Sequence, residues 1–420
     1  MLESLVAHSI RARGAMVALL AMLLVAGVYA MTQLPIDAMP DVSTIQVSVL
    51  TKVGGLSAVE TERAVNIPIE NALNGVPGAV ELRSMADSGV SSVTVVFDDS
   101  TDPWFARQLV IERLRGIEAS LPSNAETPEL GPISSGLGEI YMFIMRSEHH
   151  SPMQLRTLLD WEIVPRLRTV RGVIEVNAMG GELKQFQVRV DAARLAAHHI
   201  TLKDVIESLR VANLNAGAGY VERGPEAFVV RGEGLLKDEQ EIGAVVLRTV
   251  PNEAPLLVRN VAEVRVAPAL RYGVVTHNGE GEAVQGTVMM LLGSNSHDVV
   301  IAVAAEVEKI RKDLPPGVTI ETVYDRSDFV GRTLETVLHN LLEGIAVVIL
   351  VLAIFTGSLR GALAVVLGIP SAMAIALIGM NLFGVTGDIM SLGAIDFGFL
   401  VDGPIVVLEA VIAATTGKNI

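Results

Sequence analysis

The apolar residues of this chain gather in four runs, and their placement restricts its fold more than any other feature. The first, residues 14–34, carries no charged residue and is long enough to cross about 30 Å of hydrocarbon. Three more follow near the other end of the chain, at residues 337–355, 361–380 and 389–415, separated by short loops. The sequence therefore predicts four membrane-spanning helices with a large segment between the first and the second.

The first run shares one property with a secretory signal peptide, because Arg11 and Arg13 precede it. It is longer than the apolar part of a typical signal peptide, and the following QLPIDAMP has no small-x-small cleavage site. We therefore expect a retained anchor. If the amino-terminus is cytoplasmic, Arg11, Arg13, Arg360 and Lys418 all fall on the cytoplasmic side, as the positive-inside rule requires.

The intervening residues 35–336 then lie outside the cytoplasm and hold nearly all of the chain's net charge of −15. An acidic domain argues against nucleic acid as a partner and suits the attraction of cations, although solubility alone also explains such a charge. The sequence contains no Cys, which excludes both disulfides and a thiolate metal site within it.

Hydrophobic periodicity within residues 35–336 alternates between strands and helices. Segments 44–51, 56–76, 79–86, 91–98 and 103–121 predict the order strand, helix, strand, strand, helix. This order forms the core of a split βαβ unit. Similar orders recur with strands at 139–147, 172–179, 184–191, 287–294 and 318–325 and helices at 152–168, 192–211 and 297–314. The glycine-rich residues 217–234 predict an extended hairpin.

The fourth apolar run carries three acids, Asp396, Asp402 and Glu409. Seven residues separate the last two, so on a helix they lie within about 20° of one face, with Asp396 about 120° away. Ionisable groups at membrane depth are costly and usually face a bundle interior or a water-filled path, where they can pass a proton stepwise. The structural alternative is an acid neutralised by a neighbouring helix for packing alone.

This layout resembles that of the resistance-nodulation-division (RND) transporters. The carrying features are one amino-terminal span, a large α+β loop, and a bundle that opens with ETVLHNLLEGIAVVILVLAIFTGSLRGAL and reaches DFGFLVDGPIVVLE. The fourth-span pattern D-F-G, three residues, D-G and then Glu is similar to the heavy-metal efflux branch, as are LPIDAMPDVS and GPISSGLGEIYMF. Pro404 and Ala410 depart from the residues usual in the family at these positions.

The resemblance implies an α-helical membrane protein with a large α+β extracytoplasmic domain, that is, an RND porter fold with βαβ-type (ferredoxin-like) subdomains and a docking subdomain. The expected division is a cytoplasmic segment and first span at 1–34, a first porter subdomain at 35–134, a second one at 135–181 and 271–336, a docking-type subdomain at 182–270, and three further spans at 337–420.

The implied function is proton-driven export of divalent heavy-metal cations such as zinc, cobalt or cadmium. Asp396, Asp402 and Glu409 would form the proton relay, with no cofactor and no enzymatic reaction. The implied location is the inner (plasma) membrane of a bacterium, as a multi-pass homotrimer that works with a periplasmic adaptor (membrane fusion protein) and an outer-membrane channel. No phosphate-binding G-x-x-x-x-G-K-[ST] loop is present, so ATP is not the expected energy source.

Candidates for metal contact lie in the outer loop. Glu139, inside the matched GLGEI segment, is the predicted metal-path residue. The histidine pairs His149/His150 and His198/His199 suit zinc, but adjacent residues diverge on strands and helices, so surface positions are expected. Met142 and Met145 suit a soft ion, yet they should face opposite sides of a strand and serve in packing, as should Met289 and Met290.

Two alternatives stay open. One is an exporter of the same superfamily for drugs and amphiphiles or for copper and silver. The other is a non-transporting, membrane-anchored binding or scaffold fragment. Because family members have a second half that repeats this layout and supplies partners for the relay, the chain is expected to be the amino-terminal part of a pump.

Overall fold

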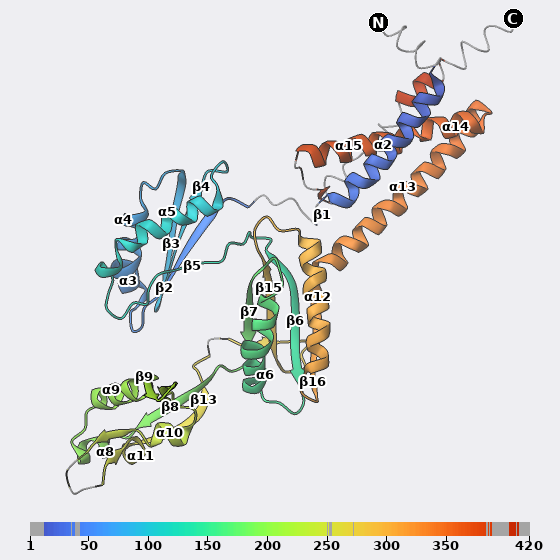
Figure 1. Cartoon of the computed structure of the whole chain (residues 1–420). Coiled ribbons are helices and arrows are strands. Elements are labelled where there is room, and N and C mark those ends of the chain that lie inside the picture. The colour runs from blue at the N-terminus through green and yellow to red at the C-terminus, as the bar shows by residue number, and fades with distance from the viewer. Residues whose placement is uncertain are drawn as a thin grey trace, which may run out of the picture.

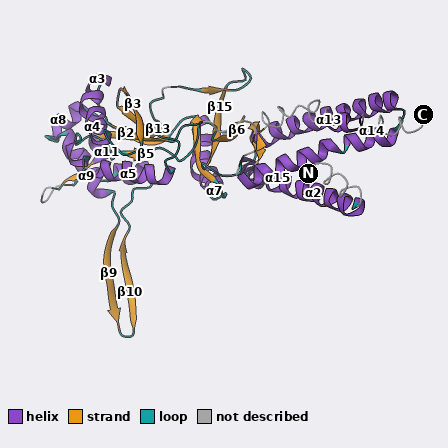
Figure 2. Cartoon of the chain, turned by 90° about the horizontal axis from the view of Figure 1, so that it is seen from above, coloured by secondary structure: helices purple, strands orange, loops and turns teal. Residues whose placement is uncertain are grey.

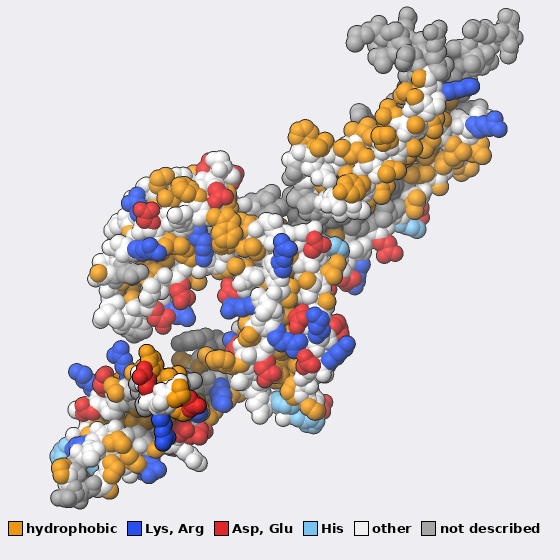
Figure 3. All heavy atoms as spheres, viewed as in Figure 1, with side chains coloured by type: hydrophobic (Ala, Val, Ile, Leu, Met, Phe, Trp, Pro, Cys, Tyr) orange, Lys and Arg blue, Asp and Glu red, His pale blue; other side chains and the backbone are white. Residues whose placement is uncertain are grey.

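The computed structural model describes residues 12–34, 36–37, 43–249, 251, 254–271, 273–383, 385, 387–388, 403–408 and 410. Three α+β units lie toward one end of the molecule, and long helices extend from them toward the other (Figure 1). Each unit has its own hydrophobic core. Hydrophobic side chains cover the long helices, whereas charged side chains are spread over the α+β units (Figure 3).

The first unit is an antiparallel sheet in the order β3-β4-β2-β5 with helices on one face. Its strands are β2 (Gln46–Lys52), β3 (Ala79–Asp87), β4 (Val90–Phe97) and β5 (Glu129–Leu130), and its helices are α3 (Ala58–Thr61), a π-helical turn η1 (Glu62–Asn66), α4 (Ile67–Leu73) and α5 (Pro103–Arg115). Alternate residues of β2, including Val47 and Val49, enter the core. The predicted strand order is confirmed, but the helix expected over 103–121 ends early, at Arg115, and a short 3₁₀ turn (η2, Glu118–Ser120) follows.

The second unit is a five-stranded sheet whose central strand, β15, pairs with both β6 and β7. Its strands are β6 (Glu139–Ser147), β7 (Val173–Gly180), β14 (Val275–Thr276), β15 (Glu282–Met290) and β16 (Val318–Asp325). One face packs against α6 (Pro152–Leu158), the π-helical turn η3 (Leu159–Ile163), α7 (Val164–Arg168) and α12 (Ser296–Asp313). Gly286 is required at the centre of this sheet, because a Cβ there would come within 2.3 Å of the Phe143 ring.

The third unit is inserted between β7 and β15. Its elements are β8 (Lys184–Val190), α8 (Ala192–His198), α9 (Leu202–Ala212), β9 (Ala216–Arg223), β10 (Glu226–Gly232), α10 (Glu239–Gly243), β11 (Val246–Arg248), β12 (Leu256–Leu257), α11 (Val258–Val261) and β13 (Ala262–Pro268). Strands β8 and β13 form an antiparallel ribbon. The predicted hairpin is confirmed as β9 and β10, which project from the body of the unit (Figure 2).

Two described helical segments are long and apolar enough to cross a membrane. They are α2 (Arg13–Gln33), and the segment Leu359–Phe383 that comprises α14 (Leu359–Val366) and α15 (Gly368–Phe383). Helices α2 and α15 approach closely at Gly27, where a Cβ would lie 2.4 Å from that of Ala374. A two-stranded parallel pair, β1 (Ile36–Asp37) with β17 (Gly387–Asp388), joins the segments that follow these two helices.

The second predicted span, 337–355, lies within a longer helix, α13 (Arg326–Thr356), which contains the apolar stretch Leu342–Phe355. His339 and Glu343 form an exposed ion pair 3.1 Å long on this helix. The fourth predicted span falls mostly outside the described residues.

Candidate functional site

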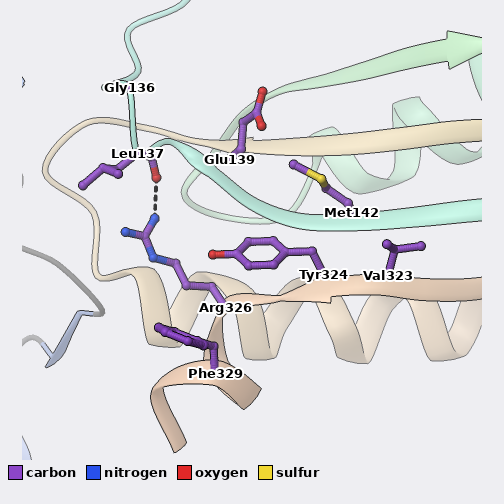
Figure 4. Close-up of a pocket in the computed structure, with 8 residues that line it drawn as sticks. All are labelled: Gly136, Leu137, Glu139, Met142, Val323, Tyr324, Arg326 and Phe329. Atoms are coloured by element: carbon purple, nitrogen blue, oxygen red, sulfur yellow. Dashed lines mark hydrogen bonds between the residues drawn. The ribbon is translucent and has the colours of Figure 1, made fainter. Parts of the chain in front are cut away.

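The candidate site is an open pocket of about 570 Å³ at one end of the second sheet, between the start of β6, the end of β16 and the first turn of α13. The lining residues are Gly136, Leu137, Glu139, Met142, Val323, Tyr324, Arg326 and Phe329 (Figure 4). Glu139, the residue predicted for a metal path, is exposed here. The pocket thus places one carboxylate and one thioether on a mainly apolar wall.

A β-bulge explains why neighbouring residues share the pocket wall. The register between β16 and β6 shifts between Thr322 and Tyr324, which leaves Val323 as the extra residue. In a regular strand Val323 and Tyr324 would point to opposite faces, but a bulge re-aims side chains, and both line the pocket. Val323 is 53% exposed, so the apolar wall is open to solvent.

Beside Glu139, the sheet brings together residues that are far apart in the sequence. Met289 of β15 is the register partner of Glu139 on β6 and also of Glu175 on β7. Cross-strand partners have adjacent side chains on one face of a sheet. The side-chain amide of Asn177 donates a hydrogen bond to Met289 Sδ over 3.1 Å. The strand register therefore places Glu139, Met289 and Glu175 side by side on three strands, at a point where both pairings shift register.

The charge of Glu175 is partly offset by Arg168, whose Nη2 lies 3.9 Å from Oε1 of Glu175. At this distance and with both side chains partly exposed, the pair is weak. Glu175 is not predictable from the sequence, because nothing in the pattern of β7 marks it, and only the strand order places it beside Met289. Among the described residues, no three His, Asp or Glu side chains gather closely enough to hold a metal ion by themselves.

The opposite face of the same sheet is closed by a buried hydroxyl network. Tyr141 is buried, and its hydroxyl lies 2.7 Å from Oγ1 of Thr322, to which Arg311 Nη2 donates over 3.1 Å. Burial raises the pKa of Tyr141 above its ordinary value, so this phenol stays neutral at physiological pH. The network is structural, and the chemistry-bearing groups lie on the open face.

The other candidates from the sequence lie apart from this pocket. His149 and His150 sit at the far end of β6, where the Ser147 hydroxyl lies 3.0 Å from Nδ1 of His150. His198 ends α8 and His199 adopts a left-handed conformation just after it, with φ of 56°. Met142 and Met145 face opposite sides of β6 as expected, but only Met145 is buried in the core, whereas Met142 lines the pocket. The predicted relay acids, Asp396, Asp402 and Glu409, lie outside the described residues.

Residues 5–418 match the model of the AcrB/AcrD/AcrF family. The chain belongs to this family. Protein HelA of Legionella pneumophila is 41% identical over 416 residues, which cover 97% of this chain and 39% of HelA. The cobalt-zinc-cadmium resistance protein CzcA of Cupriavidus metallidurans is 42% identical over 392 residues, which cover 91% of this chain and 37% of CzcA.

A crystal structure of a heavy metal efflux pump (crystal form II) matches this family member with a TM-score of 0.88 at 36% identity, covering 96% of this chain and 40% of that pump. The resemblance to RND heavy-metal pumps is thereby confirmed, and the structural match supports the RND porter fold. The chain spans about two fifths of the length of the curated relatives it matches.

Proposed function

We propose that this chain is part of the inner-membrane subunit of a proton-driven pump that exports divalent heavy-metal cations across a bacterial cell envelope. The observation that carries the proposal is the row formed by Glu139, Met289 and Glu175 beside an open pocket, in a chain of the AcrB/AcrD/AcrF family. Carboxylates suit hard and borderline divalent ions, and CzcA, a relative, is named for resistance to cobalt, zinc and cadmium.

Glu139, Met289 and Glu175 supply too few ligands for a complete metal site. Two carboxylates and one thioether leave a divalent ion short of ligands, and zinc usually takes four. An ion held this loosely can move on, as a transport path requires. We assign Glu139 and Glu175 to the capture of the ion and expect the remaining ligands to come from other parts of the assembled pump.

For the membrane segment, we propose that Asp396, Asp402 and Glu409 carry protons inward while the ion is exported. Each charge that crosses the membrane contributes about 2.3 kcal/mol per 100 mV. Pro404 lies two residues after Asp402 and has no backbone N–H to donate, so we expect a kink beside this acid. This makes the protein a secondary transporter, a proton antiporter, rather than an enzyme.

We also propose the subunit organisation that the resemblance implies. The first unit would be one porter subdomain, the second unit the other, and the inserted third unit the docking subdomain, with α2, α13, α14 and α15 in the lipid bilayer. A homotrimer with a periplasmic adaptor and an outer-membrane channel is the expected assembly. The exposed apolar side chains of the β9–β10 hairpin, Tyr220, Phe228 and Val229, support a contact with another subunit.

The test is cation export from proteoliposomes that contain the full-length pump, with an imposed pH gradient. Zinc, cobalt, cadmium, copper(I) and an amphiphilic dye are compared. Gradient-dependent flux of a divalent ion that is lost in Asp402→Asn supports the proposal, provided that the variant inserts and folds as the parent does. Normal export by Asp402→Asn would contradict the relay.

The second candidate is export of copper(I) or silver(I), which the thioethers of Met142 and Met289 favour. Flux of copper(I) without divalent flux in the same experiment would select this candidate. Flux of the dye alone would select the drug and amphiphile branch, and an absence of any flux would favour the scaffold alternative.

A further inference from the structure

The first residue of α13 is a buried cation. Arg326 is only 3% exposed, although it lies at the junction between β16 and the long helix that leads to the apolar stretch Leu342–Phe355. A guanidinium removed from water is costly unless hydrogen bonds compensate it. The contacts that this side chain makes must therefore compensate for its loss of hydration.

Arg326 reaches across the mouth of the pocket to the opposite rim. Its Nη1 donates a hydrogen bond to the main-chain carbonyl of Leu137 (Figure 4). Leu137 belongs to the rim segment, residues 133–138, which leads directly into Glu139 at the start of β6. The bond thus joins the helix α13 to the segment that precedes the proposed ion-capturing carboxylate.

The other side of the rim segment is fixed to β15. The hydroxyl of Ser134 donates to the carbonyl of Met290 over 3.0 Å, and the amide of Met290 donates to the carbonyl of Gly138 over 2.7 Å. Gly138 leaves no room for a side chain, because a Cβ there would lie 1.7 Å from Oγ of Ser134. One side of the rim is therefore tied to the sheet, and Arg326 connects its other side to α13.

Helix α13 can transmit a displacement along its axis, because it is long and uninterrupted. It is continuous over 31 residues, which corresponds to about 46 Å, and contains no proline. Its start is fixed by Asp325, whose carboxylate accepts from the amide of Ser327 over 2.8 Å and from that of Asp328 over 3.1 Å. A hydrogen bond weakens steeply beyond its narrow range of lengths, so a shift of about 1 Å at the helix start either pulls Leu137 or breaks the bond.

We propose that Arg326 is a positioning residue that couples the axial position of α13 to the geometry of the pocket rim, and thereby to the readiness of Glu139 to capture an ion. This inference rests on the proposed export function for its transport consequence. The mechanical part, a tether between α13 and residues 133–138, stands on the contacts alone. Arg326 itself does not touch the transported ion.

The experiment compares Arg326→Gln and Arg326→Lys in the intact, reconstituted pump. The matched control is Arg332→Gln, which makes the same change on the same helix, where Arg332 is 77% exposed and pairs only weakly with Asp328. Hydrogen–deuterium exchange is measured for peptides covering residues 131–139 and, as a folding check, for α13. Export of zinc is measured as kcat and KM.

We expect Arg326→Gln to raise the exchange rate of the rim about tenfold, since a hydrogen bond from a charged donor is lost. The KM for zinc should rise by a similar factor, while kcat stays within about twofold. Arg326→Lys keeps the charge and one donor, so its increases in rim exchange and in KM should be smaller. In Arg332→Gln the rim exchange and the KM should equal those of the parent.

Equal rim exchange and equal KM in Arg326→Gln and Arg332→Gln would overturn the inference. So would a loss of protection throughout α13 in both Arg326 variants, because Arg326 would then serve folding alone. If the parent pump moves no cation, the proposed function fails, yet the exchange measurement still decides whether the tether exists.

Discussion

The first and second α+β units share a strand-helix-strand architecture but differ in what their open faces carry. On the first sheet, Ser48 of β2 and Thr94 of β4 share a hydrogen bond of 3.1 Å, and Arg83 donates to Gln46. These polar groups satisfy one another. On the second sheet, two carboxylates flank a thioether without any such pairing between them. The two units therefore carry different side chains on a common scaffold, and their functions differ through those few side chains.

The units also differ in how they connect to the long helices. The first sheet is drawn from residues 46–130, and its last strand leads into the second unit. In the second unit, by contrast, β16 runs directly into α13. Of the two described sheets, the second therefore has the direct helical connection to the apolar stretch Leu342–Phe355.

The largest effect should come from removing a core ring in either unit. Phe143→Ala and Phe97→Ala each delete a side chain that is at most 1% exposed, and each should cost about 3–5 kcal/mol of stability. Denaturant-dependent hydrogen exchange should show the loss only in the unit that carries the change. If Phe97→Ala loosened the second sheet equally, the two cores would not be independent.

Removing the charge of the proposed capture residue should give the next largest effect. Glu139→Gln should lower kcat/KM for zinc export about tenfold, which corresponds to about 1.4 kcal/mol. The matched control is Glu81→Gln on the first sheet, where Glu81 is exposed and lies 3.8 Å from Arg83. Similar losses in both variants would show that the open face of the second sheet is not special.

A smaller effect is expected at the ion pair between α7 and α12 over the second core. Hydrogen bonds from Lys309 and then Arg166 lower the pKa of Glu306 below its ordinary value. Since the folded pKa is depressed, the stabilisation is present at neutral pH and is lost as the pH falls through the folded pKa. Glu306→Gln should lower the free energy of unfolding by about 1 kcal/mol at pH 7. At a pH below the range in which glutamate ordinarily titrates, the substitution should change it little.

Thermal unfolding of the parent and Glu306→Gln at several pH values checks this expectation. A difference in melting temperature that grows as the pH falls would contradict the assigned cause. The first unit provides the internal reference, because its exchange protection should not respond to this substitution.

The smallest effect is expected from the histidines at the far end of β6. Replacing His149 and His150 together with Ala should change zinc export by less than about twofold, because the pocket lies at the other end of the strand. A large loss of zinc tolerance in cells would show that this end of the second sheet also takes part in transport.

Sequence periodicity was sufficient to predict most elements of both sheets, because strands such as β6 and β16 alternate or run continuously apolar between clear turns. The third predicted span, 361–380, lies within the apolar segment Leu359–Phe383, where the helix is interrupted at Leu367 because Pro370 removes the donor that would reach the carbonyl of Val366. Periodicity failed where tertiary context decides. The bulge at Val323 depends on pairing with β6, which periodicity does not contain.

The candidate site was accessible from sequence only in part. Glu139 was selected through a motif and remains a predicted metal contact. Glu175 and Met289 lie 36 and 150 residues further along the chain, and only the strand register places them in one row. The burial of Arg326 could not be predicted from the sequence either, because an arginine after a strand is ordinarily exposed to solvent.

The inserted third unit has a consequence for biosynthesis. Strand β6 leaves the ribosome roughly 130 residues before its partner β15, so its edges stay unpaired while the insertion is translated. The insertion pairs its own two ends, with Lys184 opposite Pro268 and the amide of Ala269 bonded to the carbonyl of Leu183 over 2.9 Å. Once the insertion has folded, it brings β7 and β15 close together. The contacts within the insertion then offset the entropy cost of closing a loop of about 100 residues. The folded insertion thus helps β15 to reach its partners during synthesis. Deletions that spare both sheets but prevent the two ends of the insertion from pairing should yield aggregated pump.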